Sequence, residues 1–334
     1  MILSLCEMIL IVTNKEDVHP NPVIEYLNTH KHPVFRLNTE SLLTDYELNW
    51  WCDERGVDLH IKNVRNGLEV YGHDINSVWE RRPTLPTELV YRNCAEIDKY
   101  NLGEAGGFLS FLLYYVSDKF SIGHHLYDRS AASKMLQLKI AKELGMNVPV
   151  TCFSNRKADI VAFSQNYEYV TLKPIEADFL CFGDEYEYVF YTRKVKSSLL
   201  AEQPEEAFLQ TVSYVQDYVE KDFELRVTVV CDKCFACRIN SQVMDEDRGK
   251  TDWRQGFDYG LQHEVFELPN YIQCFCRNFL SRMHLNFGCF DFVVTPKGQY
   301  VFLECNPNGQ WLWIEYQTGM KISEAIAEAL VRGY

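Results

Sequence analysis

The sequence predicts a mixed α/β protein with more than one folded unit, and three observations lead to this prediction. Strand-like and helix-like segments alternate through the first 120 residues, a spacing that favours a parallel sheet flanked by helices. Near the carboxy terminus, two apolar runs flank Pro296-Lys297-Gly298, which predicts a β-hairpin and therefore an antiparallel part. A chain of 334 residues is long enough for two or three units with cores of their own.

Residues 1–120 are expected to form the first unit, a small Rossmann-like α/β domain in which residues 1–7 are a dispensable extension. The pattern predicts strands at 8–14, 34–38 and 77–80, a helix around 23–27, a hairpin closed by Asn66-Gly67 and a helix over 96–120. Arg81 and Arg82 follow the third strand. Ligands of open α/β sheets gather at the carboxyl ends of strands, so one of these arginines is expected to face a site or to form a structural salt bridge.

Composition excludes several classes of partner. The formal charge of −14 argues against nucleic acid and anionic membranes. The apolar start of the chain lacks a basic region and is interrupted by Glu7, so neither a signal peptide nor a membrane span is expected. The 12 cysteines are scattered, which indicates a reducing cytoplasm. Cys231, Cys234 and Cys237 have the spacing of a metal cluster, but Asp232-Lys233 resembles a hairpin turn, which favours a structural interpretation.

The hairpin around Gly298 carries the strongest chemical signal. If its strands pair about the turn, Asp291 falls nearly opposite Glu304, and Asn306 shares the face of Glu304. Such oxygen donors suit Mg²⁺. The alternative is a half-buried hairpin whose polar residues face solvent. The opposite face is expected to be buried and to contain Phe292, Val294, Val301 and Leu303.

Two lysines are predicted to contact phosphates. Lys134 lies early in an amphipathic helix that ends at Gly145, where an ordinary solvated lysine is the alternative. Lys173 is embedded in the apolar strand YVTLKPI, where an ammonium group is costly unless it meets an anion. The extended run QDYVE has backbone groups suited to an adenine edge, with Glu220 at the ribose; its candidate residues are Asp217, Tyr218, Val219 and Glu220.

In this order, these parts resemble the ATP-grasp fold across roughly residues 120–330, preceded by a small α/β domain. Several phrases are similar to the microviridin-type peptide macrocyclases, the graspetide-forming ligases: VWERRP, the SK-x-LQL-x-IA helix, KDFELRVTVV, TDWR and LECNPNGQWLW. The resemblance implies a central ATP-grasp subdomain at 121–215 and a C-terminal subdomain at 216–334. One departure is that a single glycine, Gly183, follows Lys173 where many ATP-grasp enzymes have a glycine-rich loop.

The resemblance also implies a reaction. ATP would bind through Lys134 and Lys173, with Mg²⁺ held by the oxygen donors around Glu304. An Asp or Glu side chain of a ribosomal precursor peptide would become an acyl phosphate, which a Ser or Thr hydroxyl or a Lys amine would then attack to close an ω-ester or ω-amide ring. Arg238 and Arg254 are expected to stabilise the phosphoryl oxygens and the oxyanion, with a structural role as the competitor for Arg254. No general base stands out; His263 and Asp252 are considered.

Members of that family bind a leader segment of their substrate through a hairpin of the central subdomain. Here the hairpin would present Asp184, Glu185 and Glu187, which suits a basic leader, although a charge run is also typical of a solvated face. Family precedent further implies a homodimer. Two rival functions remain at this point: an ATP-grasp ligase of free small amino or carboxylic acids, and a non-catalytic nucleotide-dependent peptide-binding protein. A kinase is a further option.

Overall fold

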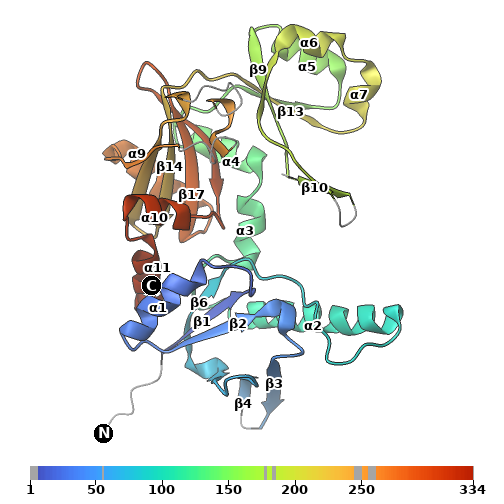
Figure 1. Cartoon of the computed structure of the whole chain (residues 1–334), viewed down its shortest axis with the longest axis vertical. Coiled ribbons are helices and arrows are strands. Elements are labelled where there is room, and N and C mark those ends of the chain that lie inside the picture. The colour runs from blue at the N-terminus through green and yellow to red at the C-terminus, as the bar shows by residue number, and fades with distance from the viewer. Residues whose placement is uncertain are drawn as a thin grey trace.

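The computed structural model describes residues 7–54, 56–176, 179–182, 186–243, 250–254 and 261–333. Figure 1 shows them as an elongated molecule, with the N-terminal unit at one end, the central unit at the other and the C-terminal sheet between them.

The N-terminal unit is built on a parallel sheet with the strand order β2-β1-β6-β7. Its strands are β1 (Met8–Thr13), β2 (Val34–Asn38), β6 (Ile75–Glu80) and β7 (Phe120–Ile122). Alternate residues of β1 point to opposite faces, so Ile9 and Ile11 pack with α1 (Pro20–Thr29), whereas Leu10 and Val12 pack with α2 (Ala95–Tyr115). A separate antiparallel sheet consists of β3 (Tyr46–Asp53), β4 (Gly56–Asn63) and β5 (Glu69–Tyr71). Its buried side chains pack in the same core as Leu10, Val12 and α2.

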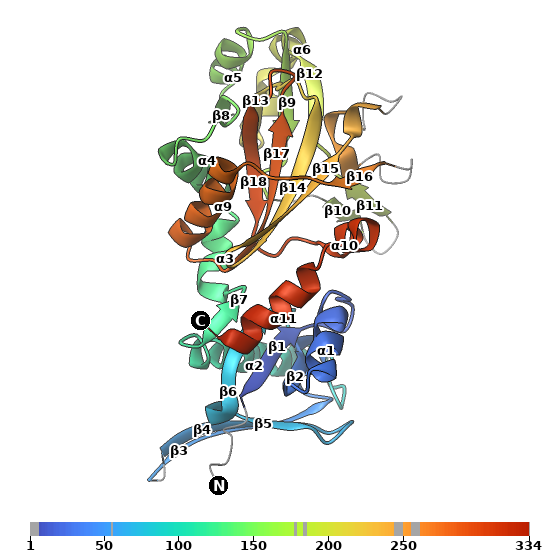
Figure 2. The ribbon, with the colours of Figure 1, turned by 90° about the vertical axis from the view of Figure 1, so that its left-hand side faces the viewer.

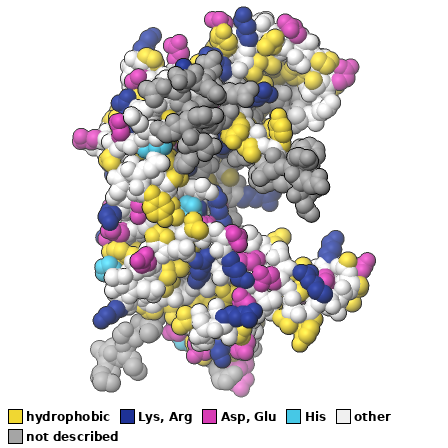
Figure 3. Space-filling model, viewed as in Figure 1, with side chains coloured by type: hydrophobic (Ala, Val, Ile, Leu, Met, Phe, Trp, Pro, Cys, Tyr) yellow, Lys and Arg dark blue, Asp and Glu magenta, His cyan; other side chains and the backbone are white. Residues whose placement is uncertain are grey.

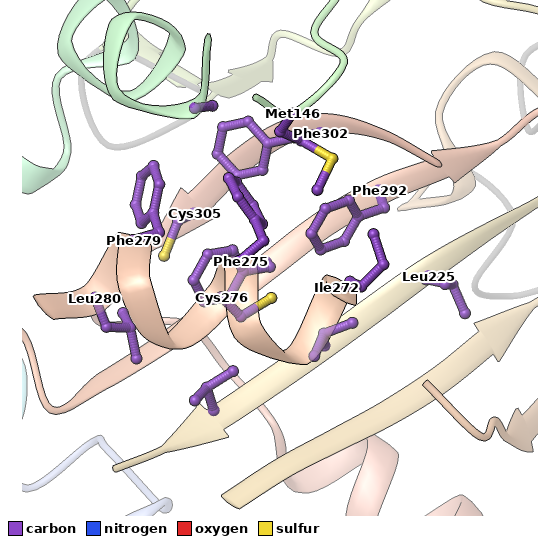
Figure 4. Close-up of a cluster of buried hydrophobic side chains, with 14 of the residues drawn as sticks. Met146, Leu225, Ile272, Phe275, Cys276, Phe279, Leu280, Phe292, Phe302 and Cys305 are labelled. Atoms are coloured by element: carbon purple, nitrogen blue, oxygen red, sulfur yellow. The ribbon is translucent and has the colours of Figure 1, made fainter. Parts of the chain in front are cut away.

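The C-terminal sheet is antiparallel and has the strand order β16-β15-β14-β17-β18. Its strands are β14 (Phe223–Val230), β15 (Lys233–Ile239), β16 (His263–Val265), β17 (Phe287–Val294) and β18 (Tyr300–Asn306). Helices α4 (Lys134–Glu143) and α9 (Asn270–Arg282) pack on one face of this sheet. Between α9 and the strands lies a core rich in phenylalanine, in which Phe275, Phe279, Phe292 and Phe302 are close together (Figure 4).

The central unit is a four-stranded antiparallel sheet with the order β12-β9-β13-β8. Its strands are β8 (Thr151–Ser154), β9 (Tyr169–Lys173), β12 (Arg193–Lys196) and β13 (Ser213–Asp217), and its helices are α5 (Lys157–Ser164), α6 (Ser197–Glu202) and α7 (Glu205–Leu209). The hairpin of β10 (Phe179–Phe182) and β11 (Tyr186–Val189) projects from this unit in Figure 1. The predicted hairpin in this region is therefore present.

The last helix, α11 (Ile322–Arg332), packs the C-terminal end of the chain against the N-terminal unit. It follows α10 (Leu312–Thr318) and lies between the N-terminal unit and the C-terminal sheet (Figure 2). Its buried face packs with α1 and β6, and the Ser77 hydroxyl donates a hydrogen bond to the Leu330 carbonyl oxygen at 2.7 Å. The N-terminal unit is thus fixed relative to the strands that carry the site.

Two predicted helices differ in the structure. The helix expected from Asp128 to Gly145 is two helices, α3 (His125–Ala131) and α4, because Ser133 adopts an extended backbone and ends the first one. Lys134 is consequently the first residue of α4. The helix expected to reach Phe120 ends at Tyr115, and Phe120 instead starts β7, where it pairs with Ser77.

Candidate active site

The three predicted metal ligands lie side by side on β17 and β18. Asp291 pairs with Glu304 across the hairpin. The Asn306 amide nitrogen is 3.4 Å from Asp291 Oδ2 and 3.3 Å from Glu304 Oε1. Rotation of the amide about its last bond places Oδ1 at the same position, so the site offers three oxygen donors, two carboxylates and one amide. This donor set fits a hard cation such as Mg²⁺.

A β-bulge in the hairpin corrects one detail of the sequence prediction. The register shifts between Asp291 and Phe292, so Phe292 faces Phe302, and Leu303 is the extra residue. Phe292, Val294, Phe302 and Cys305 therefore lie in the phenylalanine core. Val301 is buried as predicted but outside this core, and Leu303 is only half-buried. The bulge allows Phe302 and Glu304 to point to opposite faces although they are two residues apart.

Arg226 is the site residue that the sequence analysis did not single out. It lies on β14 opposite Asp291, and its Nη1 donates to Asp291 Oδ2 at 2.6 Å. Burial raises the pKa of Asp291, and the Arg226 charge opposes this shift. The available signal was the position of Arg226 between Leu225 and Val227, since a charged residue inside an apolar strand needs a buried partner.

Both predicted phosphate lysines lie beside Glu304. The Lys134 ammonium donates to the Glu304 carboxylate. Burial alone would raise the pKa of Glu304, but the charges of Lys134 and Lys173 outweigh it and hold the pKa at about 2. Burial lowers the pKa of Lys173, and the Glu304 charge counteracts this. The site therefore combines cationic and anionic side chains that lie close together. Figure 3 shows Lys and Arg side chains where this face of the molecule is hollowed between its upper and lower parts.

The TDWR segment lies next to this cluster. Arg254 makes two contacts with the Asp252 carboxylate, at 2.9 Å through Nε and 2.7 Å through Nη2. The same carboxylate accepts a hydrogen bond from the Thr192 backbone N–H at 3.1 Å. The Arg254 charge also contributes to lowering the pKa of Glu304, so the arginine is near the predicted metal ligands. His263 packs edge-on against Trp313, and burial lowers its pKa.

The structure does not bring Arg238 to this cluster. Residues paired across antiparallel strands share a face, and Arg238 pairs with Leu225, which lies in the phenylalanine core. Its guanidinium lies over the Phe223 ring at 4.0 Å, on the sheet face opposite Arg226. The catalytic role of Arg238 stays a prediction, and the structure places this residue on the sheet face opposite Arg226, Asp291 and Glu304.

The predicted adenine-binding run connects β13 to β14 and so joins the central and C-terminal sheets. The Asp217 carboxylate accepts a hydrogen bond from the Val150 N–H at 2.8 Å, and the Asp217 N–H donates to the Val150 carbonyl. The Tyr218 N–H donates to the Tyr169 carbonyl, and the Tyr218 ring lies under Lys194. Asp217 and Tyr218 thus position the run, and the binding of a nucleotide by Asp217, Tyr218, Val219 and Glu220 stays a prediction.

The three predicted leader-binding residues cannot be placed. Asp184 and Glu185 lie outside the described residues, and Glu187 is on β11 but its side chain is also outside the description.

Comparison with solved structures shows which class of protein has this fold. No protein-family model matches the chain, and no curated protein matches it significantly. A Chryseobacterium gregarium RiPP-associated ATP-grasp ligase, solved with ADP and a leader and core peptide, is similar at a TM-score of 0.88 and 27% identity, over 98% of this chain and 97% of that one. The Microcystis aeruginosa macrocyclase MdnC, bound with precursor peptide MdnA, is similar at a TM-score of 0.81 and 25% identity, over 98% and 100% of the two chains.

A third structure shares the fold alone. The ATP-grasp ligase PsnB, complexed with minimal precursor, Mg and ADP, has a TM-score of 0.73 and 17% identity, over 99% of this chain and 98% of that one. The fold is therefore that of the ATP-grasp ligases. The more specific resemblance, to the microviridin-type macrocyclases, is confirmed as well, and it extends over nearly the whole chain.

Proposed function

We propose that this protein is an ATP-dependent peptide macrocyclase that closes ω-ester or ω-amide links in a ribosomally made precursor peptide. The observation that carries this proposal is the cluster of Asp291, Glu304 and Asn306 with two lysines. This cluster lies in a chain that matches peptide-bound ATP-grasp ligases from end to end. Neither rival function from the sequence has a structural observation that favours it.

In this proposal, Lys134 and Lys173 bind the phosphates of ATP, and the oxygen donors around Glu304 hold Mg²⁺. When bound, Mg²⁺ neutralises charge on the phosphates. Lys134 donates to the Glu304 carboxylate, and the Glu304 charge also acts on Lys173, so both ammonium groups are available to the same anionic group. Val219 and Glu220 are proposed to contact the nucleoside.

The proposed reaction has two steps. A peptide carboxylate attacks the γ-phosphorus of ATP, which gives an acyl phosphate and releases ADP. A Ser or Thr hydroxyl, or a Lys amine, of the same peptide then attacks the acyl carbon, loses its proton and expels phosphate. Arg254 and Arg226 are the guanidinium groups near the site that are positioned to stabilise negative charge in these steps. Asp252 holds Arg254 through both of its oxygens.

We also propose that the β10–β11 hairpin binds the leader of the peptide through Asp184, Glu185 and Glu187. The described strands of this hairpin, β10 and β11, project from the central unit in Figure 1, which supports the idea. Reversal of the three charges should weaken peptide binding and flatten its salt dependence. Unchanged affinity and salt dependence would exclude the hairpin as the binding surface.

A homodimer in the cytoplasm is the proposed state of the protein. Helix α2 exposes large apolar side chains, with Tyr100 at 66% and Phe111 at 72% exposure, and pairing with a second copy would remove them from water. The described cysteines are free, which suits a reducing compartment. Among the described helices, none is long and apolar enough to cross a membrane. Sedimentation of the wild type and of Phe111→Glu tests the dimer.

The decisive experiment uses the peptide encoded beside the gene for this protein. Incubation of that peptide with the protein, ATP and Mg²⁺ should remove one water per link, as measured by mass spectrometry. A gain of phosphate would instead indicate a kinase. ADP release with free amino acids but not with peptide would indicate a small-acid ligase.

A further inference from the structure

The turn that follows the last predicted metal ligand is held by the N-terminal unit. Residues 307–309 form a turn that, with Gln310, connects Asn306 at the end of β18 to the buried Trp311. Gly309 lies so close to β17 that a Cβ atom there would be 2.4 Å from the Cys289 Cβ. The turn therefore has no room to shift toward the sheet, and its position depends on what contacts it from the other side.

Arg81 makes that contact together with Arg82, which donates to the Asn308 carbonyl, and Asp128, which accepts from the Asn308 side-chain amide. Arg81 follows β6 in the N-terminal unit, is 1% exposed, and its Nη1 donates to the Asn308 carbonyl at 2.7 Å and to the Gly309 carbonyl at 3.1 Å. Its guanidinium also lies over the Trp311 ring at 5.0 Å. One side chain thus fixes two successive carbonyl groups and the indole that ends the turn.

The Arg81 side chain is itself held in place. Its Nε donates to Asp17 Oδ2 at 2.9 Å, and the other oxygen of Asp17 accepts from the backbone N–H and from Nδ1 of His19. The His19 ring packs edge-on against Trp311 at 4.6 Å. Burial lowers the pKa of Arg81 to about 10, although the negative charge of Asp17 acts to raise it. The guanidinium therefore stays charged at neutral pH.

The next carbonyl along the turn belongs to the site. Gln310 O accepts from Arg226 Nη2 at 3.5 Å, and Arg226 also binds Asp291. Two buried arginines from different units therefore hold successive carbonyls of one short turn, directly after Asn306. A displacement of the turn would move Asn306 and the Arg226–Asp291 pair together.

We propose that Arg81 is a positioning residue for the metal site: it clamps the 307–309 turn so that Asn306 and Asp291 face Glu304. This inference rests on the proposed function, since it assigns the clamp to the Mg²⁺ ligands of that site. It gives the N-terminal unit a role in the chemistry although that unit supplies no metal ligand.

The test measures ADP affinity by calorimetry with Mg²⁺ and with a chelator, alongside the melting temperature. The double variant Arg81→Met, Asp17→Asn removes both buried charges, and Arg81→Lys keeps the charge but loses the guanidinium fork. We expect the Mg²⁺-dependent gain in ADP affinity to fall roughly 10-fold or more in the double variant, as for other residues that orient metal ligands, and by less in Arg81→Lys. ADP affinity in the chelator should change less than about twofold in both variants, because these contacts orient only the metal ligands.

The matched control is Ser77→Ala. The buried Ser77 hydroxyl also donates from the N-terminal unit to a carbonyl, Leu330 O at 2.7 Å, but Leu330 lies on α11 and not in the turn. This variant should lower the melting temperature and keep the Mg²⁺-dependent gain. If the Arg81 variants melt earlier with an undiminished gain, Arg81 is only structural and the inference is overturned. A wild type without any Mg²⁺-dependent gain would instead overturn the metal assignment of the proposed function and this inference with it.

Discussion

Replacement of Glu304 by Gln is the most direct perturbation of the proposed site. The change keeps the shape of the side chain and removes one negative charge from a cluster that contains Lys134 and Lys173. The pKa of Glu304 is about 2, against an ordinary value of 4.5, so the carboxylate is fully ionised at neutral pH. At about 1.36 kcal/mol per pKa unit, this difference corresponds to about 3 kcal/mol of favourable interaction in the folded state. The value is an upper bound because the side chain is 31% exposed.

Two results follow for Glu304→Gln. Turnover should fall at least ~100-fold, since the metal loses its charged ligand and residues that merely orient ligands already matter 10–100-fold. The free energy of unfolding at pH 7 should also fall, by at most about 3 kcal/mol. Because the folded pKa is depressed, this stabilisation is present above about pH 4.5 and is lost as the pH falls toward 2. The difference between wild type and variant should therefore shrink in acid.

The assays are peptide-dependent ADP release, mass spectrometry of the peptide and chemical denaturation at two pH values. Glu324→Gln is the matched control, because Glu324 makes an exposed ion pair with Lys321 on α11, away from the site. That variant should keep wild-type turnover. Wild-type turnover in Glu304→Gln would refute the reasoning.

Three further predictions concern the charged residues Lys173, Asp252 and Glu80. Lys173→Met should raise the ATP KM at least ~10-fold, because the proposed phosphate contact is lost. The melting temperature should not fall, because removing the ammonium group from water is itself costly. A lower melting temperature with an unchanged KM would contradict this prediction. Asp252→Asn weakens the two-contact ion pair that holds Arg254. It should reduce kcat ~10–100-fold, which corresponds to the free energy of one hydrogen bond to a charged group, while the ATP KM stays constant. Burial raises the pKa of Glu80 to about 7, so wild-type stability should decline between about pH 4.5 and 7, by at most about 3 kcal/mol. Glu80→Gln should flatten that decline in thermal melts, and an unchanged slope would contradict the assignment.

Local patterns in the sequence were sufficient for several parts of the fold. Strand β2 has the predicted bounds, and the β17–β18 hairpin turns at Gly298, whose positive φ of 73° suits glycine. The approach of Asp291 to Glu304 followed from counting outward from that turn. These features depend only on alternation and turn chemistry, which are properties of neighbouring residues.

Other parts needed the folded chain. The bulge at Leu303 changed which residues entered the core, because Phe302 fills a space bounded by α9. The sequence analysis singled out Arg238 and not Arg226, and the pairing of β14 with β15 and β17 puts the two arginines on opposite faces. A strand pattern states that faces alternate; which face meets the site is decided by the neighbouring strands.

The sequence by itself determined the hairpin with its oxygen donors, the lysine within the apolar strand β9 and, through their order, the ATP-grasp class. The tertiary structure alone decided which charges meet. Lys134 reaches Glu304 across 170 residues, and Arg81 reaches Asn308 across 227. Such pairs form only after helices and sheets have packed, because periodicity fixes the face on which a side chain lies but not the distant group that covers it.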